Sequence, residues 1–211
     1  MNIHDEVVLI LAPHTDDAEF GCGGAILKLL ENNCKVFVVA FSCAEESVPE
    51  HLPKQINKTY MHDAMEILGI PLENVLIKNY PVRYFPENRQ SILEELVKLN
   101  NEINPGIVFL PSTFDTHQDH QVISQEGFRA FKKTTLLGYE MPWNNLMFTT
   151  TCFITLEERH VEKKLKSLEC YISQMGRDYI SADFVRSLMR SRGGQMGKIF
   201  AEAFQVIRIN F

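Results

Sequence analysis

Apolar residues follow two patterns along this chain. Short continuous apolar runs, typical of strands buried on both faces, alternate with longer stretches in which apolar residues recur every three or four positions, as in helices packed on a core. The runs predict strands over residues 6–12, 36–41, 75–77, 107–110, 135–140, 147–155 and 204–209. The longer stretches predict helices over residues 25–30, 61–68, 92–103, 119–131, 161–172 and 181–202, with glycines interrupting the last one.

This alternation predicts an α/β protein in which helices cover both faces of an open, mainly parallel sheet. We expect a three-layer, Rossmann-like fold and a single domain over residues 1–211, because no linker, repeat or low-complexity tract divides the sequence. In sheets with the strand order 3-2-1-4, the first and fourth strands are neighbours, and ligands bind beyond their carboxyl ends, where the order reverses. Segments that follow these two strands are therefore expected to share one crevice.

Histidines and carboxylates follow both of these strands. The first group, Pro13-His14-Thr15-Asp16-Asp17-Ala18-Glu19, comes directly after the first strand, and the second, His117-Gln118-Asp119-His120, comes shortly after the fourth. Zinc readily binds imidazole nitrogen and carboxylate oxygen, and a catalytic zinc site keeps one position open for water. The two groups together favour a metal-dependent hydrolase.

Three of these side chains, His14, Asp17 and His120, can supply the protein ligands of one metal ion. The neighbouring carboxylate of Asp16 can then act as the general base that takes a proton from water. His117 can donate a hydrogen bond or a proton on the far side of the reacting carbonyl.

Simpler interpretations also exist for each motif. Asp119 can accept from an imidazole N–H and so fix the tautomer of that ring. The second motif as a whole can equally be a solvated polar loop. Asp16 or Asp17 can cap the helix that follows, by accepting from free N–H groups at its start. The position of both motifs at neighbouring strand ends favours the metal site over these alternatives.

The glycines after the first motif indicate a turn near the site. Gly21, Gly23 and Gly24 lack the spacing of the dinucleotide-binding fingerprint, which argues against a Rossmann-type oxidoreductase. We expect them instead to permit close packing.

The composition narrows the class of protein and its partners. Of the 211 residues, 45% are hydrophobic and 23% charged, as in globular domains with a sizeable core. The net charge of -6 argues against nucleic-acid partners. The five cysteines form no Cys-x-x-Cys pair, which favours reduced thiols. Because no basic-then-apolar leader or membrane-length apolar run is present, we expect a cytoplasmic protein with no integral membrane association.

The two motifs resemble the signatures of the LmbE-like, or PIG-L, zinc-dependent de-N-acetylases, which remove an acetyl group from N-acetylglucosamine-type sugars. That family's first signature, Ala-His-Pro-Asp-Asp-x-Glu followed by glycines, matches residues 13–24, with Thr15 in place of the proline. Its second, His-x-Asp-His, matches residues 117–120. Weaker sequence similarities at residues 139–140, 166–174 and 201–204 extend the resemblance over nearly the whole chain.

The resemblance implies that the three ligands named above bind zinc and that Asp16 is the base. It implies that His117 polarises the carbonyl or protonates the leaving amine, with Asp119 behind it. An Asp/His/His site also accepts iron(II), manganese or cobalt.

One departure from the family concerns the substrate side. Many members carry an Arg-x-x-Glu pair, and the aligned positions here are Asn57 and Tyr60, so we expect a different wall facing the substrate. Arg83, Glu140 and Arg177 are candidates for substrate binding, although each is also compatible with an ordinary position on the surface or at the rim of the pocket.

We therefore expect a hydrolase of a linear amide C–N bond, which removes the N-acetyl group from an N-acetylated amino sugar or glycoconjugate through a zinc-bound water and an aspartate base. One alternative is a metal-dependent amidase that acts on a non-sugar acyl amide. Another is a non-catalytic module that binds metal or sugar, although a purely structural zinc normally closes its fourth position with protein. The sequence leaves the oligomeric state open, with a homo-oligomer as one alternative.

Overall fold

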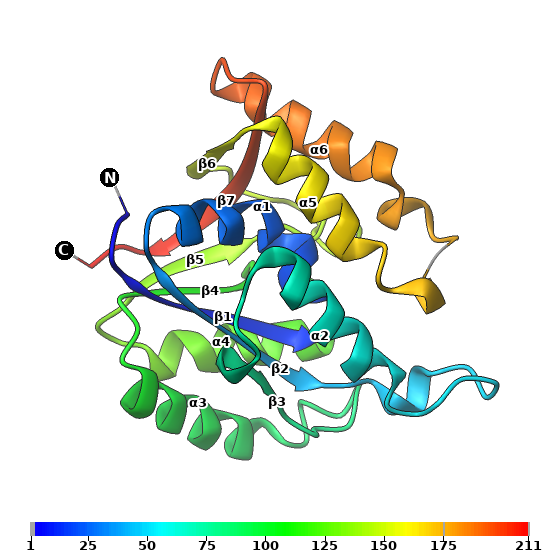
Figure 1. Ribbon diagram of the computed structural model, residues 1–211. Coiled ribbons are helices and arrows are strands. Elements are labelled where there is room, and N and C mark those ends of the chain that lie inside the picture. The colour runs from blue at the N-terminus through cyan, green and yellow to red at the C-terminus, as the bar shows by residue number, and fades with distance from the viewer. Residues whose placement is uncertain (1–2, 175, 211) are drawn as a thin grey trace.

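One mixed sheet organises the protein (Figure 1). The computed structural model describes residues 3–174 and 176–210, and within them the sheet has seven strands. These are β1 Val7–His14, β2 Lys35–Ser42, β3 Val75–Ile77, β4 Ile107–Pro111, β5 Thr135–Tyr139, β6 Cys152–Leu156 and β7 Phe200–Arg208. Their order is β3-β2-β1-β4-β5-β7-β6, in which β7 runs antiparallel to both of its neighbours and the other pairs are parallel.

Helices cover both faces of this sheet. In the described residues the α-helices are α1 Asp17–Glu31, α2 Ile56–Leu68, α3 Arg89–Ile103, α4 Gln118–Ala130, α5 Glu158–Leu168 and α6 Ala182–Gln195. α3 and α4 lie on one face, and α1, α2, α5 and α6 lie on the other (Figure 1). Along β1, Ile10 packs into the α1 layer while Leu9 and Leu11 pack into the α3–α4 layer, which explains its continuous apolar run. The predicted three-layer α/β fold is confirmed.

The glycines of the first motif do not form the predicted turn, because α1 runs through them. A Cβ at Gly21 would lie 2.5 Å from a ring carbon of Tyr139, and a Cβ at Gly24 would lie 2.4 Å from Leu156. Glycine weakens an isolated helix. Here, however, only residues without side chains allow α1 to approach β5 and β6 this closely, so tertiary packing overrides helix propensity. The close packing that we expected of these glycines is present.

The predicted boundary between the last helix and the last strand was wrong. α6 ends at Gln195, and β7 already begins at Phe200. The reversal is made by Gly197, whose φ of 63° lies in the left-handed region, and by Lys198 N–H, which donates to the Gly193 carbonyl at 2.9 Å. This is a glycine-dependent helix ending, which apolar periodicity does not register.

A buried ion pair ties α1 to the rest of its layer. Lys164 Nζ on α5 lies 2.6 Å from Glu202 Oε1 on β7, and both side chains are almost fully buried. The Glu202 carboxylate also accepts from Gly24 N–H at 2.9 Å and Ala25 N–H at 2.7 Å. Lys164 in turn donates to the Phe20 carbonyl at 2.6 Å. The pair therefore binds backbone groups in the middle of α1, where the glycines bring the helix close.

The two halves of the metal motif meet because β1 pairs directly with β4. The register sets Val8 opposite Ile107 and Ile10 opposite Phe109. β1 then ends at His14, and β4 leads into the loop that precedes α4. The two motifs therefore meet at the carboxyl edge of the sheet, as the strand order predicts.

We expect Lys164→Met to lower the free energy of unfolding by about 3–5 kcal/mol, because it leaves a buried carboxylate without its counter-charge. The double variant Lys164→Met/Glu202→Gln removes the isolated charge and should regain part of the loss. Urea denaturation followed by circular dichroism measures both. A loss below about 1 kcal/mol in the single variant, the size typical of exposed pairs, would mean that water reaches this pair.

Candidate metal centre

One carboxylate oxygen lies between two imidazoles at the carboxyl edge of the sheet. Asp17 Oδ2 is 3.2 Å from His14 Nδ1 and 3.3 Å from His120 Nε2. Ligand atoms that hold zinc tetrahedrally at roughly 2.0–2.1 Å are themselves about 3.3 Å apart. All three ligand atoms lie within 4.8 Å of one another. The donor set and its spacing therefore fit a divalent cation.

Carboxylates hold both imidazoles from their outer sides. His14 Nε2 lies 3.0 Å from Asp119 Oδ2, and His120 Nδ1 lies 2.8 Å from Asp115 Oδ2. An ionised carboxylate can only accept, so each outer nitrogen carries a proton and each inner nitrogen faces Asp17. Such partners fix the orientation and tautomer of metal-binding histidines. Asp115 lies between the fourth strand and the second motif, and no sequence pattern assigned it a role.

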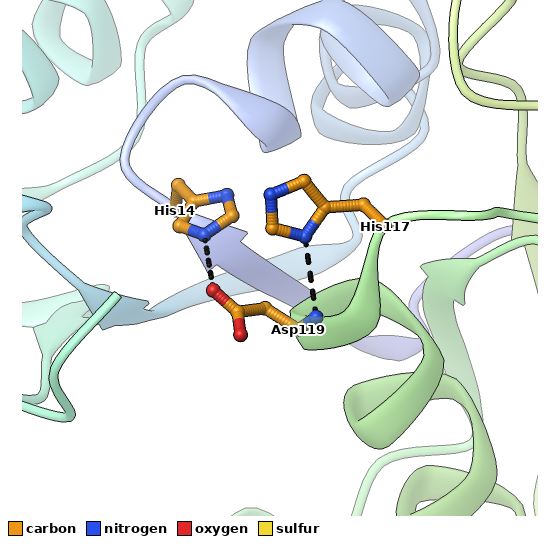
Figure 2. A group of neighbouring side chains, drawn as sticks. All are labelled: His14, His117 and Asp119. Carbon is orange, nitrogen blue, oxygen red and sulfur yellow. Dashed lines mark hydrogen bonds and ion pairs between the residues drawn. The ribbon is translucent and has the colours of Figure 1, made fainter. Parts of the chain in front are cut away.

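A second group of possible ligands, formed by His14, His117 and Asp119, also lies within 4.8 Å (Figure 2). His117 Nδ1 and the Asp119 carboxylate already accept hydrogen bonds from backbone N–H groups. Asp119 N–H donates to His117 Nδ1 at 3.2 Å, and the Asp119 carboxylate accepts from Arg83 N–H at 2.7 Å. The Asp119 carboxylate holds His14 from its outer side, whereas Asp17 lies between the two inner imidazole nitrogens, so the group around Asp17 fits a metal better.

The carboxylates also determine the charge of the site. Burial alone would lower the pKa of His14, but Asp119 and Asp17 raise it to about 9. Burial would likewise lower the pKa of His120, but Asp17 and Asp115 raise it to about 10. Burial would raise the pKa of Asp17, yet the two imidazoles hold it below its ordinary value. This concentration of negative charge favours a divalent cation in exchange for protons.

Asp16 lies beside this group but stays free of it. It occupies the N-cap position of α1, yet in the described structure its side chain accepts no capping hydrogen bond. The helix-cap interpretation therefore does not account for this carboxylate. Burial, together with the negative charge of Asp17, raises the pKa of Asp16 to about 6. A partly buried carboxylate with a pKa near neutrality is suited to taking up a proton and giving it back.

His117 has a defined tautomer. Because its Nδ1 accepts from the backbone, the proton of the neutral ring must reside on Nε2. Burial and the positive charges of His120 and His14 lower the pKa of His117, which keeps the ring neutral. The family resemblance implied that Asp119 supports the His117 ring from the side away from the substrate. In the structure the Asp119 backbone takes that position, while its carboxylate holds His14 (Figure 2).

The three residues predicted to bind substrate have other contacts. Arg83 has a φ of 71° and reaches the site through its backbone N–H on Asp119, while its guanidinium is exposed. The Glu140 carboxylate is bound at both oxygens by Arg192. Arg177 is exposed, and its guanidinium donates to the hydroxyl of a neighbouring tyrosine. Their role in substrate binding stays a prediction.

Comparison with known proteins assigns a family to this constellation. Residues 9–131, more than half of the chain, match the family described as PIG-L: GlcNAc-PI de-N-acetylase. A relative from Escherichia coli K12, the uncharacterized deacetylase YaiS, is 23% identical over 167 residues, which cover 77% of this chain and 88% of the relative.

Two solved structures show how widely the fold is used. The N,N'-diacetylchitobiose deacetylase of Pyrococcus horikoshii has a TM-score of 0.76 at 21% identity, over 96% of this chain and 84% of that one. GalB, the 4-carboxy-2-hydroxymuconate hydratase of Pseudomonas putida KT2440, has a TM-score of 0.77 at 16% identity, over 98% of each chain. Because one is a deacetylase and the other a hydratase, the fold alone does not determine the reaction.

We expect Asp115→Asn to weaken metal affinity by about 10–100-fold, because the amide no longer holds the outer nitrogen of His120 with a charged acceptor. Competition with a chromogenic chelator measures the affinity, and Asp63→Asn, at an exposed position of α2, is the matched control. An unchanged affinity in Asp115→Asn would show that this carboxylate does not orient a ligand.

Proposed function

The chain belongs to the PIG-L, or GlcNAc-PI de-N-acetylase, family, and on this basis we propose that it removes the N-acetyl group from an N-acetylated amino sugar or glycoconjugate by metal-dependent hydrolysis. One observation carries the proposal: Asp17 lies between two imidazoles, each held from outside by a carboxylate, and the adjacent Asp16 makes no capping hydrogen bond within the described residues. The deacetylase relative and the chitobiose deacetylase of the same fold support the reaction class.

The protein supplies a site for a divalent cation. His14, Asp17 and His120 would hold it, and we propose zinc, with iron(II), manganese or cobalt as alternatives. Once bound, such a cation contributes positive charge that polarises the acetyl carbonyl and lowers the pKa of water. The hydrogen-bonded carboxylates behind the two imidazoles keep the ligands in place.

The remaining chemistry falls to two side chains. Asp16, with its pKa near 6, takes a proton from the water that attacks the acetyl carbonyl. The N–H of the neutral His117 ring donates to the oxygen on which negative charge develops. As the C–N bond breaks, the protonated Asp16 returns its proton to the leaving nitrogen, which yields acetate and a free amine.

Other substrates would use the same machinery. A non-sugar acyl amide would be hydrolysed by the same steps, and the hydratase of the same fold suggests addition of water to a carbon–carbon double bond as a further alternative. Acetate release distinguishes deacetylation from hydration. In the described part of the chain, no helix has both the length and the apolar character needed to cross a bilayer. A cytoplasmic location stays a prediction from the sequence.

We expect Asp16→Asn to reduce kcat by about 10²–10⁴-fold while the bound metal stays at its original stoichiometry, because the amide cannot accept the proton of the attacking water. Metal analysis and acetate release are measured on the same preparation. Wild-type turnover in this variant would contradict the assignment of the base.

We expect chelation to abolish acetate release and one added divalent cation to restore it, which would identify the working metal. The assay covers N-acetylated sugars with and without phosphate or nucleotide groups, together with plain acetamides. Hydrolysis of the acetamides alone would replace the sugar with a non-sugar amide. Activity that survives complete metal removal would contradict the proposed mechanism.

A further inference from the structure

A polar pocket of about 350 Å³ opens at the carboxyl ends of β2 and β3. Its volume falls within the range of roughly 300–1,000 Å³ that is usual for small-molecule sites. Side chains that can bind hydroxyl groups dominate the lining, which includes Ser42, Glu45, Glu46, Gln55, Asn79 and Tyr80.

This pocket lies next to the metal centre. Ser42 at the end of β2 is in register with His14 at the end of β1, and adjacent strands are about 4.8 Å apart. On its other side, the segment that continues from Tyr80 reaches Arg83, whose N–H binds Asp119. The pocket and the metal ligands therefore lie at neighbouring strand ends on the same edge of the sheet.

Buried contacts hold the floor of the pocket in place. Asn57, at a position where the family often carries a charged residue, is buried and donates to the Cys43 carbonyl at 2.9 Å. Ala44, with a φ of 49°, donates its N–H to Ser42 Oγ at 3.1 Å. These two hydrogen bonds fix the backbone of residues 42–44, which line the pocket at the end of β2.

Two carboxylates, those of Glu45 and Glu46, line the pocket. Glu45 is partly buried and Glu46 is exposed, and neither carboxylate forms an ion pair within the described residues. The pocket lining contains no lysine or arginine in the described structure. Lys54 Nζ donates to the backbone carbonyl of Glu45, at 3.5 Å. By contrast, Glu140, which follows β5 on the other side of β1 and β4, is paired with Arg192.

We propose that this pocket binds the sugar ring whose acetamide reacts, and that Glu45 and Glu46 restrict the substrate to sugars without a phosphate or carboxylate group. The inference rests on the proposed function, because it assumes that an acetamide is placed at the metal ligands. Sugar hydroxyls match the polar lining, whereas an anionic group would be placed near two carboxylates that form no ion pair within the described residues. An ammonium group on a neighbouring sugar unit is compatible with the same carboxylates.

The decisive experiment is a binding measurement that does not need turnover. The Asp16→Asn protein is titrated with N-acetylglucosamine and with N-acetylglucosamine 6-phosphate, and the NMR signals of Tyr80 report occupancy of the pocket. We expect the uncharged sugar to bind at least about tenfold more tightly than its phosphate. Adding Glu45→Gln/Glu46→Gln should remove most of this difference.

The matched control is Glu50→Gln/Glu73→Gln, which changes the charge equally at two exposed positions outside the pocket lining and should keep the original ratio. Equal binding of the two sugars, a ratio insensitive to Glu45→Gln/Glu46→Gln, or no effect of either sugar on Tyr80 would overturn the proposal. A preference for the phosphate that Arg83→Ala abolishes would also overturn it, and would point to an anionic substrate.

Acetate release by the metal-loaded wild-type protein separates this inference from the proposed function. If acetate is released but the binding ratio behaves in one of the ways just named, the charge selection is wrong and the deacetylase proposal stands. If no N-acetylated sugar yields acetate with any divalent metal, the deacetylase proposal is wrong and the assignment of a reacting sugar to this pocket is wrong with it.

Discussion

The parallel pairing of β1 with β4 is the constraint on which the site depends, because it brings together two motifs that lie far apart in the chain. The two strands are buried on both faces, and alternate residues of β1 face different helical layers. A register slip of one residue would turn every side chain of the strand to the opposite face. The core therefore sets the register, and the register sets where His14 lies relative to the loop that carries His117 and His120.

Hydrogen bonds to buried carboxylates fix the orientation of the histidines in the site. Buried carboxylates are costly unless they are paired, and here Asp17, Asp115 and Asp119 are each paired with an imidazole. Asp119 has two roles, since it holds His14 and also accepts from the backbone of Arg83 and Phe85. The left-handed backbone of Arg83 directs its N–H toward this carboxylate. The residue thus reaches the site through its main chain rather than through its charged end.

Contacts from the Tyr171 hydroxyl stabilise the start of α1, where Asp16 and Asp17 lie. Thr15 occupies the place of the family's proline, and its carbonyl accepts from the Tyr171 hydroxyl at 2.5 Å. The same hydroxyl lies 2.7 Å from Glu19 Oε1. This one hydroxyl therefore ties the segment after α5 both to the backbone before α1 and to its first turn. Burial raises the pKa of Glu19 well above its ordinary value, although the hydrogen bond from Tyr171 acts in the opposite direction.

Much of the fold follows from local sequence patterns. Continuous apolar runs identify the buried strands, and the strand order expected for such sheets places the two motifs together. The types of residue in those motifs, imidazoles beside carboxylates, indicate a metal site before any geometry is known. These features are local in sequence, or depend on chemistry that each residue carries by itself.

Only the tertiary structure determined which group each carboxylate contacts. It assigned Asp115 to His120 and Asp119 to His14, left Asp16 without a capping role, and engaged Glu140 with Arg192. In the folded protein α1 also continues through glycines for which the sequence indicated a turn. Each of these outcomes depends on distances between elements remote in the chain, which are set by how layers pack rather than by the preferences of any single segment.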